Sequence, residues 1–125
     1  MTSSSDGSEV GTIADLSRAV QEFAAVRDWS QFHNPKNLAM SLAAEVGEVT
    51  SILRWVRDED SDVFTADGEG RRELVAEIGD VGICLLLLCA RVNVDLTTAV
   101  LGKLAANAIK YPVERSHGRA DPPPA

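Results

Sequence analysis

The chain has 125 residues, which suits one domain, and 45% of them are hydrophobic, an ordinary share for a globular protein. Its formal net charge of −7 would repel nucleic-acid backbones and anionic membranes, so we expect neither as a partner. An acidic protein can still bind a phosphate substrate when a metal ion supplies the local positive charge.

Both ends of the chain are predicted to be flexible tails. Residues 1–11 are polar and rich in serine, without the apolar segment of a secretory signal, and residues 113–125 end in a proline-rich stretch that we expect to be disordered. The longest apolar run, residues 81–90, is too short to span a bilayer. Cys84 and Cys89 lie in that run and are expected to be buried free thiols, so we expect a cytoplasmic protein.

The hydrophobic pattern between the tails predicts one domain over residues 12–112, built from helices alone. Thr12 is a suitable cap for a first helix, in which apolar residues recur at helical spacing. Further helices are expected over 35–57, 71–92 and 96–111. The predicted fold is therefore an all-α four-helix bundle, and such a small bundle often completes its core by oligomerising.

The segment between the second and third predicted helices, residues 58–70, is strongly acidic. Its acids are spaced faintly like a calcium-binding loop, but Val63 stands where that loop needs glycine. We expect a solvated acidic loop here.

Two short strings repeat in altered form on the second and third predicted helices. They are Glu45-Val46-Gly47-Glu48 and Glu77-Ile78-Gly79-Asp80. Each string places two carboxylates on one helix face beside an apolar stripe, where ionised groups are costly and would repel one another. A divalent cation bound between them would remove that conflict. Glycine within a helix costs about 1 kcal/mol relative to alanine, so Gly47 and Gly79 suggest a close approach of the two helices.

The composition of this carboxylate set favours Mg²⁺, with Mn²⁺ as the alternative, because it offers oxygen ligands and neither histidine nor cysteine. A di-iron carboxylate bundle would need a Glu-x-x-His pair on each of two helices, which the chain's two histidines, His33 and His117, do not supply. Glutamates three residues apart are also common on solvated helix surfaces, so an ordinary acidic surface remains the alternative to a metal site.

Several aromatic and polar residues near these helices could bind a planar ring and phosphate oxygens. In the connection before the second helix they are Trp29, Ser30, Gln31, Phe32 and His33. Trp55 follows Glu48 by seven residues on the same predicted helix face, about 10 Å along the axis. Lys103 and Asn107 share a polar stripe on the last helix and could reach phosphate oxygens. Tryptophans that simply pack and an ordinary polar face are the alternatives.

These residues resemble those of a known family. The paired acids, together with the strings RDWSQFHNPKNL, EVGE, RW, ELVAEIGDV and YP, look like the MazG-like all-α nucleoside triphosphate pyrophosphohydrolases, and within them the dCTP pyrophosphatase branch. The resemblance covers about residues 13–112, almost the whole of the predicted domain.

The resemblance implies a four-helix MazG-like fold assembled as a homodimer or homotetramer. It implies that Glu45, Glu48, Glu77 and Asp80 bind Mg²⁺, and that one of them acts as the general base. The implied reaction is hydrolysis of a deoxynucleoside triphosphate, dCTP or a modified relative, to the monophosphate and pyrophosphate, which serves to clear unwanted nucleotides. The segment from Trp29 to His33, and Trp55, would line the base and sugar pocket.

Two positions depart from the branch. Val20 stands where the branch has a histidine, and Cys84 stands where it has a tyrosine that would touch the nucleoside. These departures leave the metal chemistry intact but put base selectivity in doubt. A non-enzymatic alternative is a regulatory helical bundle that binds a metal or a nucleotide without catalysis.

Overall fold

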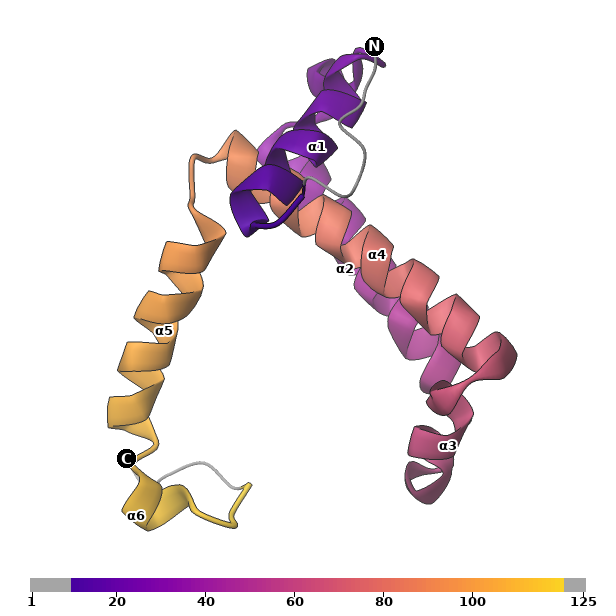
Figure 1. Cartoon of the computed structure of the whole chain (residues 1–125), viewed down its shortest axis with the longest axis vertical. Coiled ribbons are helices and arrows are strands. Elements are labelled where there is room, and N and C mark those ends of the chain that lie inside the picture. Colours follow the sequence, from indigo (N-terminus) through magenta and orange to yellow (C-terminus); the bar gives the residue numbers. More distant parts are fainter. Residues whose placement is uncertain (1–9, 121–125) are drawn as a thin grey trace. The chain divides into compact units, whose positions relative to one another are not determined.

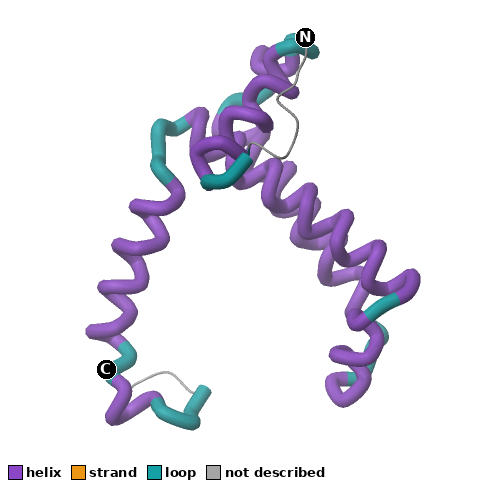
Figure 2. The backbone as a smooth tube through the Cα atoms, viewed as in Figure 1, coloured by secondary structure: helices purple, strands orange, loops and turns teal. Residues whose placement is uncertain are grey.

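The structure, a computed structural model, describes residues 10–120, and every regular element within that range is a helix. The helices are joined by short loops and turns (Figure 2). In chain order they are α1 (Ile13–Ala25), η2 (Trp29–Phe32), α2 (Pro35–Leu53), η3 (Asp58–Asp60), α3 (Ser61–Ala66), α4 (Gly68–Arg91), α5 (Leu96–Lys110) and α6 (Val113–Ser116). The predicted all-α class is confirmed. The chain divides into two compact units, Met1–Asn93 and Val94–Ala125.

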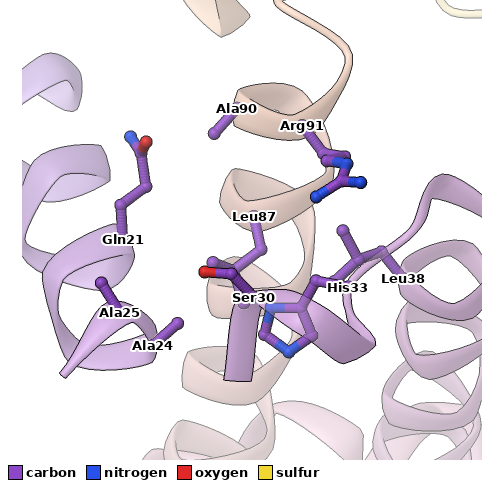
Figure 3. Close-up of a pocket in the computed structure, with 9 residues that line it drawn as sticks. All are labelled: Gln21, Ala24, Ala25, Ser30, His33, Leu38, Leu87, Ala90 and Arg91. Carbon is purple, nitrogen blue, oxygen red and sulfur yellow. The ribbon is translucent and has the colours of Figure 1, made fainter. Parts of the chain in front are cut away.

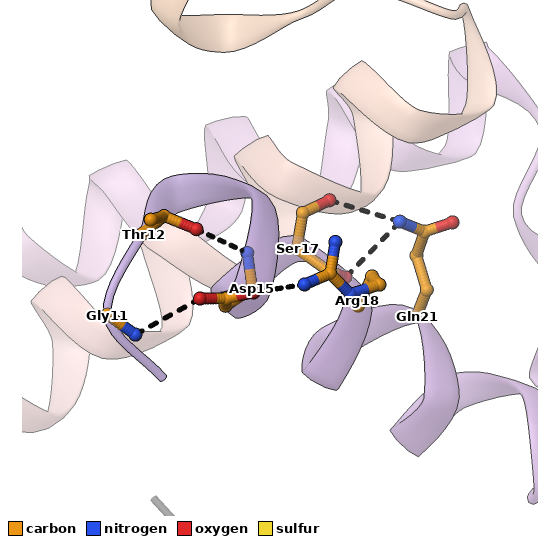
Figure 4. A network of polar contacts seen from close by, with 6 residues as sticks. All are labelled: Gly11, Thr12, Asp15, Ser17, Arg18 and Gln21. Carbon is orange, nitrogen blue, oxygen red and sulfur yellow. Dashed lines mark hydrogen bonds and ion pairs between the residues drawn. The ribbon is translucent and has the colours of Figure 1, made fainter. Parts of the chain in front are cut away.

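α1 begins at the residue that the sequence predicted. The Thr12 hydroxyl accepts a hydrogen bond from the Asp15 backbone N–H at 3.0 Å, which satisfies one of the amides left unpaired in the first helical turn. The Asp15 carboxylate in turn accepts from the Gly11 N–H at 3.2 Å and forms an ion pair with Arg18 (Figure 4). This network stabilises the first turn of α1.

The connection between α1 and α2 is compact because its backbone turns sharply. Asp28 adopts a left-handed conformation with φ of 56°, and the short 3-10 helix η2 follows it. Asn34 then caps α2 by accepting from the Asn37 N–H at 2.8 Å, and Pro35 occupies the first helical position. The predicted start of the second helix is confirmed.

The second helix is shorter at its C-terminal end than the sequence predicted. It ends at Leu53 rather than near Arg57, and the Val56 N–H donates to the Leu53 carbonyl at 3.0 Å in a tight turn. Arg57 stabilises this reversal through ion pairs with Asp60 at 3.0 Å and Glu59 at 3.5 Å. Trp55 therefore lies in a turn after the helix and not on its face.

The acidic segment 58–70, predicted to be a loop, is largely helical. It forms η3 and α3, and α4 already begins at Gly68. The acids that suggested a solvated loop lie in the first turns of these short helices, where negative charge is favourable because it offsets the helix dipole. The corner is closed by tight packing of Gly70 against Phe64.

α2 and α4 pack side by side and run antiparallel in the first unit (Figure 1). Their register can be followed along the sequence: Leu38 and Leu87 line the same cavity, and Glu45 and Asp80 belong to the same carboxylate group. A step of seven residues towards the C-terminus of α2 therefore corresponds to a step of seven residues towards the N-terminus of α4. This register brings the two acidic strings together, and α1 packs against α4 as well.

The first unit buries little of its apolar surface by itself. Among the described residues, the buried hydrophobic side chains are Ala24, Leu38, Leu86 and Cys89. Large apolar side chains on α1, α2 and α4 remain exposed. Gly47 and Gly79 do not mark a close approach within the chain, because a Cβ at either position would have no described atom within 4 Å. That prediction is wrong for the single subunit, in which both glycines lie on exposed faces.

The second unit contains α5 and α6. α5 is capped by Asp95, whose carboxylate accepts from the Thr98 N–H at 2.9 Å, and it ends before Pro112 as predicted. α6 is one short helix inside the segment 113–125, for which the sequence predicted disorder, and it follows directly on Pro112. Glu114 in its first turn and Arg115 in its last turn both oppose the helix dipole, which favours this extra turn.

Two predictions concern residues at the edge of the described range. The flexible tail over 1–11 falls mostly outside it, as does the end of the chain after residue 120. Within residues 10–120, no helix is long and apolar enough to cross a membrane.

Candidate metal centre and adjoining hollows

Three of the four predicted carboxylates converge. Ligand oxygens of Glu45 on α2 and of Glu77 and Asp80 on α4 all lie within 4.8 Å of one another. Glu45 and Glu77 are half-buried, while Asp80 is exposed. A single cation could contact all three groups, because its ligand oxygens lie about 2.0–2.6 Å from it for Mg²⁺ or Ca²⁺.

Within this group, Glu77 is the residue whose ionised form is most disfavoured by its surroundings. Its Oε2 atom is buried and has no hydrogen-bond partner among the described residues. Burial raises the pKa of this carboxyl, and so do a carboxyl–carboxyl hydrogen bond with Glu45 and the negative charges of Glu45, Asp80 and Glu48. A buried acceptor without a donor, surrounded by like charges, is the environment that a bound cation would satisfy.

Glu48 lies outside the group of three. It is exposed on α2, one turn beyond Glu45, yet it is near enough to contribute to the raised pKa of Glu77. Its carboxylate therefore faces the same region without converging on the same point.

Cys84 lies next to this cluster, one turn along α4 from Asp80. Burial raises the pKa of its thiol, and the charges of Glu45 and Asp80 raise it further. Cys84 and Cys89 are both free thiols, as the sequence predicted.

An apolar hollow of about 210 Å³ opens between α1 and α4 close to the carboxylates. Ala19, Val20, Phe23 and Ile83 line it. Ile83 is three residues from Asp80, which corresponds to about 4.5 Å along the helix axis. Trp29 of η2 packs edge-on against the Phe23 ring, with ring centroids 5.7 Å apart, so an aromatic pair borders the hollow.

The other predicted residues of η2 do not join Trp29. Ser30 and His33 line a different cavity, together with Gln21 and Ala25 of α1 (Figure 3). Gln31 donates to the backbone carbonyl and the carboxylate of Asp28, at 3.0 and 2.9 Å, and so stabilises the turn. Phe32 is exposed and lines neither cavity.

Trp55 lies far from η2, because the two are at opposite ends of α2. The helix has 19 residues and therefore spans about 28 Å. The Trp55 side chain is 85% exposed, and the Arg54 guanidinium lies 5.4 Å from its ring centroid. Within one subunit, Trp29 and Trp55 cannot hold the same nucleoside.

Lys103 and Asn107 lie on α5 in the second unit, four residues apart and hence on one helix face. Their predicted contact with phosphate oxygens stays a prediction.

Sequence reasoning missed several residues that line these hollows. Phe23 is one of the apolar residues that recur along the first predicted helix, and the sequence gives no reason to single out Gln21 or Arg91. No local pattern marks these residues, since each faces a cavity only because α1 crosses α4. The aromatic connection after Phe23 was the one available signal, as it places Trp29 within reach of that ring.

The chain is similar to curated proteins named dCTP pyrophosphatase 1. It is 43% identical to that of Bos taurus over 109 residues, which are 87% of this chain and 64% of the bovine protein. It is 43% identical to that of Homo sapiens over 101 residues, 81% of this chain and 59% of the human protein. The chain thus matches less than two thirds of the length of these relatives. No protein-family model matches it.

A solved structure is similar over nearly its whole length. The crystal structure of a pyrophosphatase from Archaeoglobus fulgidus aligns with a TM-score of 0.72 at 37% sequence identity, covering 80% of this chain and 92% of that one. Identity at this level together with the shared helical architecture confirms the predicted resemblance. The chain belongs to the MazG-like superfamily of all-α nucleoside triphosphate pyrophosphohydrolases.

Proposed function

We propose that this chain is a Mg²⁺-dependent pyrophosphohydrolase that converts dCTP, or a 5-substituted dCTP, to the monophosphate and pyrophosphate and so clears unwanted deoxynucleotides. The observation that carries the proposal is the convergence of Glu45, Glu77 and Asp80 around an unsatisfied buried oxygen. The name of the curated relatives, dCTP pyrophosphatase 1, supports the substrate. Two free thiols fit a reducing compartment, the cytoplasm.

The carboxylates divide between two roles in this proposal. Glu45, Glu77 and Asp80 hold Mg²⁺, which when bound neutralises negative charge on the phosphate oxygens. Glu48, exposed and outside the group of three, accepts the proton of the attacking water. That water attacks the α-phosphorus, the bond from the α-phosphorus to the bridging oxygen breaks, and pyrophosphate leaves.

The nucleoside lies in the apolar hollow of Val20, Phe23 and Ile83, one helical turn from Asp80. Stacking of a base on an aromatic ring is worth about 1–3 kcal/mol but discriminates poorly between bases. Val20 cannot form a side-chain hydrogen bond, and the thiol of Cys84 forms only weak ones. We therefore expect looser base selectivity than a hydrogen-bonded pocket would give. Ser30 and His33 line the adjoining cavity between α1, η2 and α4 rather than this hollow, and they remain our proposed contacts to the nucleotide.

A second copy of the chain completes the site. Because Trp55 and Trp29 lie at opposite ends of α2, a nucleoside between two tryptophans would take Trp55 from a neighbouring subunit. The predicted four-helix bundle, formed as a homodimer or homotetramer, would also cover the exposed apolar faces of α1, α2 and α4. Lys103 and Asn107 remain our proposed ligands of the phosphate oxygens.

Two variants and product analysis test this function. Purified protein is incubated with Mg²⁺ and with dCTP, 5-methyl-dCTP, dTTP, dATP or dGTP, and the products are separated. We expect dCMP and pyrophosphate from dCTP, and a loss of kcat of at least about 100-fold, or roughly 3 kcal/mol, in both Asp80→Asn and Glu48→Gln. Calorimetric titration should show weakened Mg²⁺ binding in Asp80→Asn and retained binding in Glu48→Gln.

The control variant is Asp62→Asn, which removes one acid from exposed α3 and should keep full activity. Full activity in Asp80→Asn would refute the assignment of the metal site. Release of phosphate instead of pyrophosphate would refute the reaction. Faster cleavage of dATP and dGTP than of every pyrimidine would refute the proposed substrate, and no cleavage of any triphosphate would favour a regulatory bundle without catalysis.

A further inference from the structure

Arg27 lies in the turn between α1 and η2, where its side chain contacts both aromatic rings beside the hollow proposed for the nucleoside. The guanidinium carbon lies 3.6 Å from the centroid of the Phe23 ring and 6.0 Å from that of the Trp29 ring. A cation within about 6 Å of an aromatic face is attracted by the negative charge of that face. One guanidinium nitrogen also donates to the Phe23 backbone carbonyl, at 3.1 Å. Arg27 therefore contacts Phe23 twice, on its ring and on its backbone.

Phe23 needs such contacts because its side chain is not enclosed by the protein. The residue is 50% exposed, although its ring helps to line the apolar hollow. An exposed side chain can exchange between staggered rotamers, and only one orientation of this ring lines the hollow as the structure has it. Trp29 packs against the ring at an interplanar angle of 70°, and the Arg27 guanidinium lies over its face. Together these two neighbours restrict the Phe23 ring to that orientation.

The backbone of this turn is fixed without help from the Arg27 side chain. The Arg27 N–H donates to the Ala24 carbonyl at 3.3 Å, and the Asp28 N–H donates to the Ala25 carbonyl at 3.0 Å. The Gln31 amide donates to the Asp28 carbonyl and carboxylate, at 3.0 and 2.9 Å, and holds the left-handed residue in place. A substitution at Arg27 should therefore keep the turn and remove only the contacts with the rings.

The charge of Arg27 is not used in an ion pair. Within residues 10–120, the ion pairs of arginine involve Arg18, Arg57 and Arg72, and Arg27 forms none. Its guanidinium lies against the aromatic pair instead, which shows where the side chain is held. A guanidinium carries five N–H donors, of which the Phe23 carbonyl uses one, so direct contact with the substrate is the alternative that an experiment must separate.

We infer that Arg27 is a positioning residue, which holds the Phe23 ring, and with it Trp29, in the orientation that binds the nucleoside. The inference rests on the proposed function, and it has Arg27 act through Phe23 without touching the substrate. The nucleoside is the part of the substrate that does not react. Loosening the ring therefore weakens substrate binding and leaves the chemical step unchanged.

The kinetic test is a double-mutant cycle on the full-length chain with dCTP and Mg²⁺. Arg27→Gln should raise KM about two- to fivefold, as expected for an exposed cation–π contact, and keep kcat within about 1.5-fold. Arg27→Lys keeps the charge but not the planar group, so its KM should lie between those of Arg27→Gln and the wild type. In a Phe23→Leu background, Arg27→Gln should change KM less than about 1.5-fold, because no ring is left to hold. Arg18→Gln removes a charge near the start of α1 and is the matched control, with an unchanged KM.

A fluorescence measurement separates this inference from the proposed function. The chain has two tryptophans, so Trp55→Phe leaves Trp29 as the only one. In that background, without substrate or metal, Arg27→Gln should lower the fluorescence anisotropy of Trp29 because its neighbouring ring becomes mobile, and Arg18→Gln should not. If the wild type cleaved no triphosphate, the proposed function would fail, and the Trp29 signal alone would decide whether Arg27 orders the aromatic pair.

Three results would overturn the positioning role of Arg27. The first is a Trp29 anisotropy that Arg27→Gln does not change. The second, in an active enzyme, is an unchanged KM in Arg27→Gln or an equal rise in Arg18→Gln. The third is an undiminished effect of Arg27→Gln in the Phe23→Leu background, which would mean that Arg27 contacts the substrate directly.

Discussion

Glu77 combines burial, an unpartnered oxygen and three acidic neighbours. Its pKa is raised above the ordinary value of 4.5, so the folded metal-free protein holds this proton more tightly than the unfolded chain does. The stability that the proton provides is complete below the ordinary pKa and is lost as pH rises through the raised folded value. Under the proposed function, Mg²⁺ would remove the conflict by binding the deprotonated form.

We predict that Glu77→Gln changes the pH dependence of stability. In chelator-treated protein, the Tm of the variant minus that of the wild type should increase as pH rises from 4 to 7, because glutamine keeps the neutral state that Glu77 loses. Mg²⁺ should raise the Tm of the wild type at pH 7 and not that of the variant. Glu73→Gln, an exposed change on the same helix, is the control and should show a difference independent of pH. Scanning calorimetry across this range provides the measurement, and parallel curves for the wild type and Glu77→Gln would contradict it.

At the residue scale, sequence reasoning located the carboxylates but not their separate environments. A spacing of three residues puts Glu45 beside Glu48 and Glu77 beside Asp80 on their helices, and this much follows from helix geometry. Which of them converge depends on the register of α2 against α4, which no local pattern encodes. The placement of Trp55 failed for a related reason, since it assumed a helix that ends four residues later.

Gly70 sets the corner where α3 turns into α4. A Cβ at this position would lie 2.6 Å from the Phe64 carbonyl oxygen and 2.7 Å from its ring. The backbone oxygen cannot move aside without disturbing α3. The close contact explains how a segment that looks like an acidic loop can fold back onto the start of α4.

We predict that Gly70→Ala and Gly82→Ala shift stability in opposite directions. Gly70→Ala should lower the free energy of unfolding by about 1–3 kcal/mol, as overpacking does. Gly82→Ala lies in the middle of α4 with no described atom within 4 Å of its Cβ, and it should gain about 0.5–1 kcal/mol from helix propensity. Urea unfolding followed by circular dichroism measures both. If Gly70→Ala stabilised the protein, Gly70 would not be tightly packed against Phe64 and the prediction would be wrong.

At the element scale, helix starts were more predictable than helix ends. Thr12, Asn34 and Asp95 are side-chain caps that act within three residues, and the sequence predicted the Thr12 cap and helix starts at residues 35 and 96. The end of α2 is marked by a tight turn at Leu53 and by exposed, local ion pairs of Arg57, and the start of α4 is accompanied by packing of Gly70 against Phe64. Hydrophobic periodicity reports neither of these features.

The described residues leave many large apolar side chains exposed. No described side chain is less than 2% exposed, and Ile109 on α5 is 84% exposed. The all-α class could be predicted from the helical stripes, whereas the partner of each stripe could not, because a stripe looks the same whether its own chain or a second copy covers it.

We predict that the protein is a homodimer or homotetramer at micromolar concentration and that its Tm falls on dilution, since folding and association are then one equilibrium. Light scattering gives the mass, and a dilution series of melting curves gives the coupling. Mixing Trp55→Ala with Asp80→Asn subunits, after joint refolding, should restore part of the activity that each lacks, because a mixed pair can contain one intact site. A monomer with a Tm independent of concentration would contradict this prediction.

The antiparallel pair of α2 and α4 has a local two-fold symmetry in its residue register. A local two-fold axis midway between the helices exchanges Glu45 with Asp80, Glu48 with Glu77, and Leu38 with Leu87, since each pair of residue numbers has the same sum. The acids already depart from this symmetry, because Glu45, Glu77 and Asp80 converge while Glu48 lies outside their group. α1 packs against α4 and breaks the symmetry further, so under the proposed function the face open to the substrate would be set by a helix that contributes none of these carboxylates.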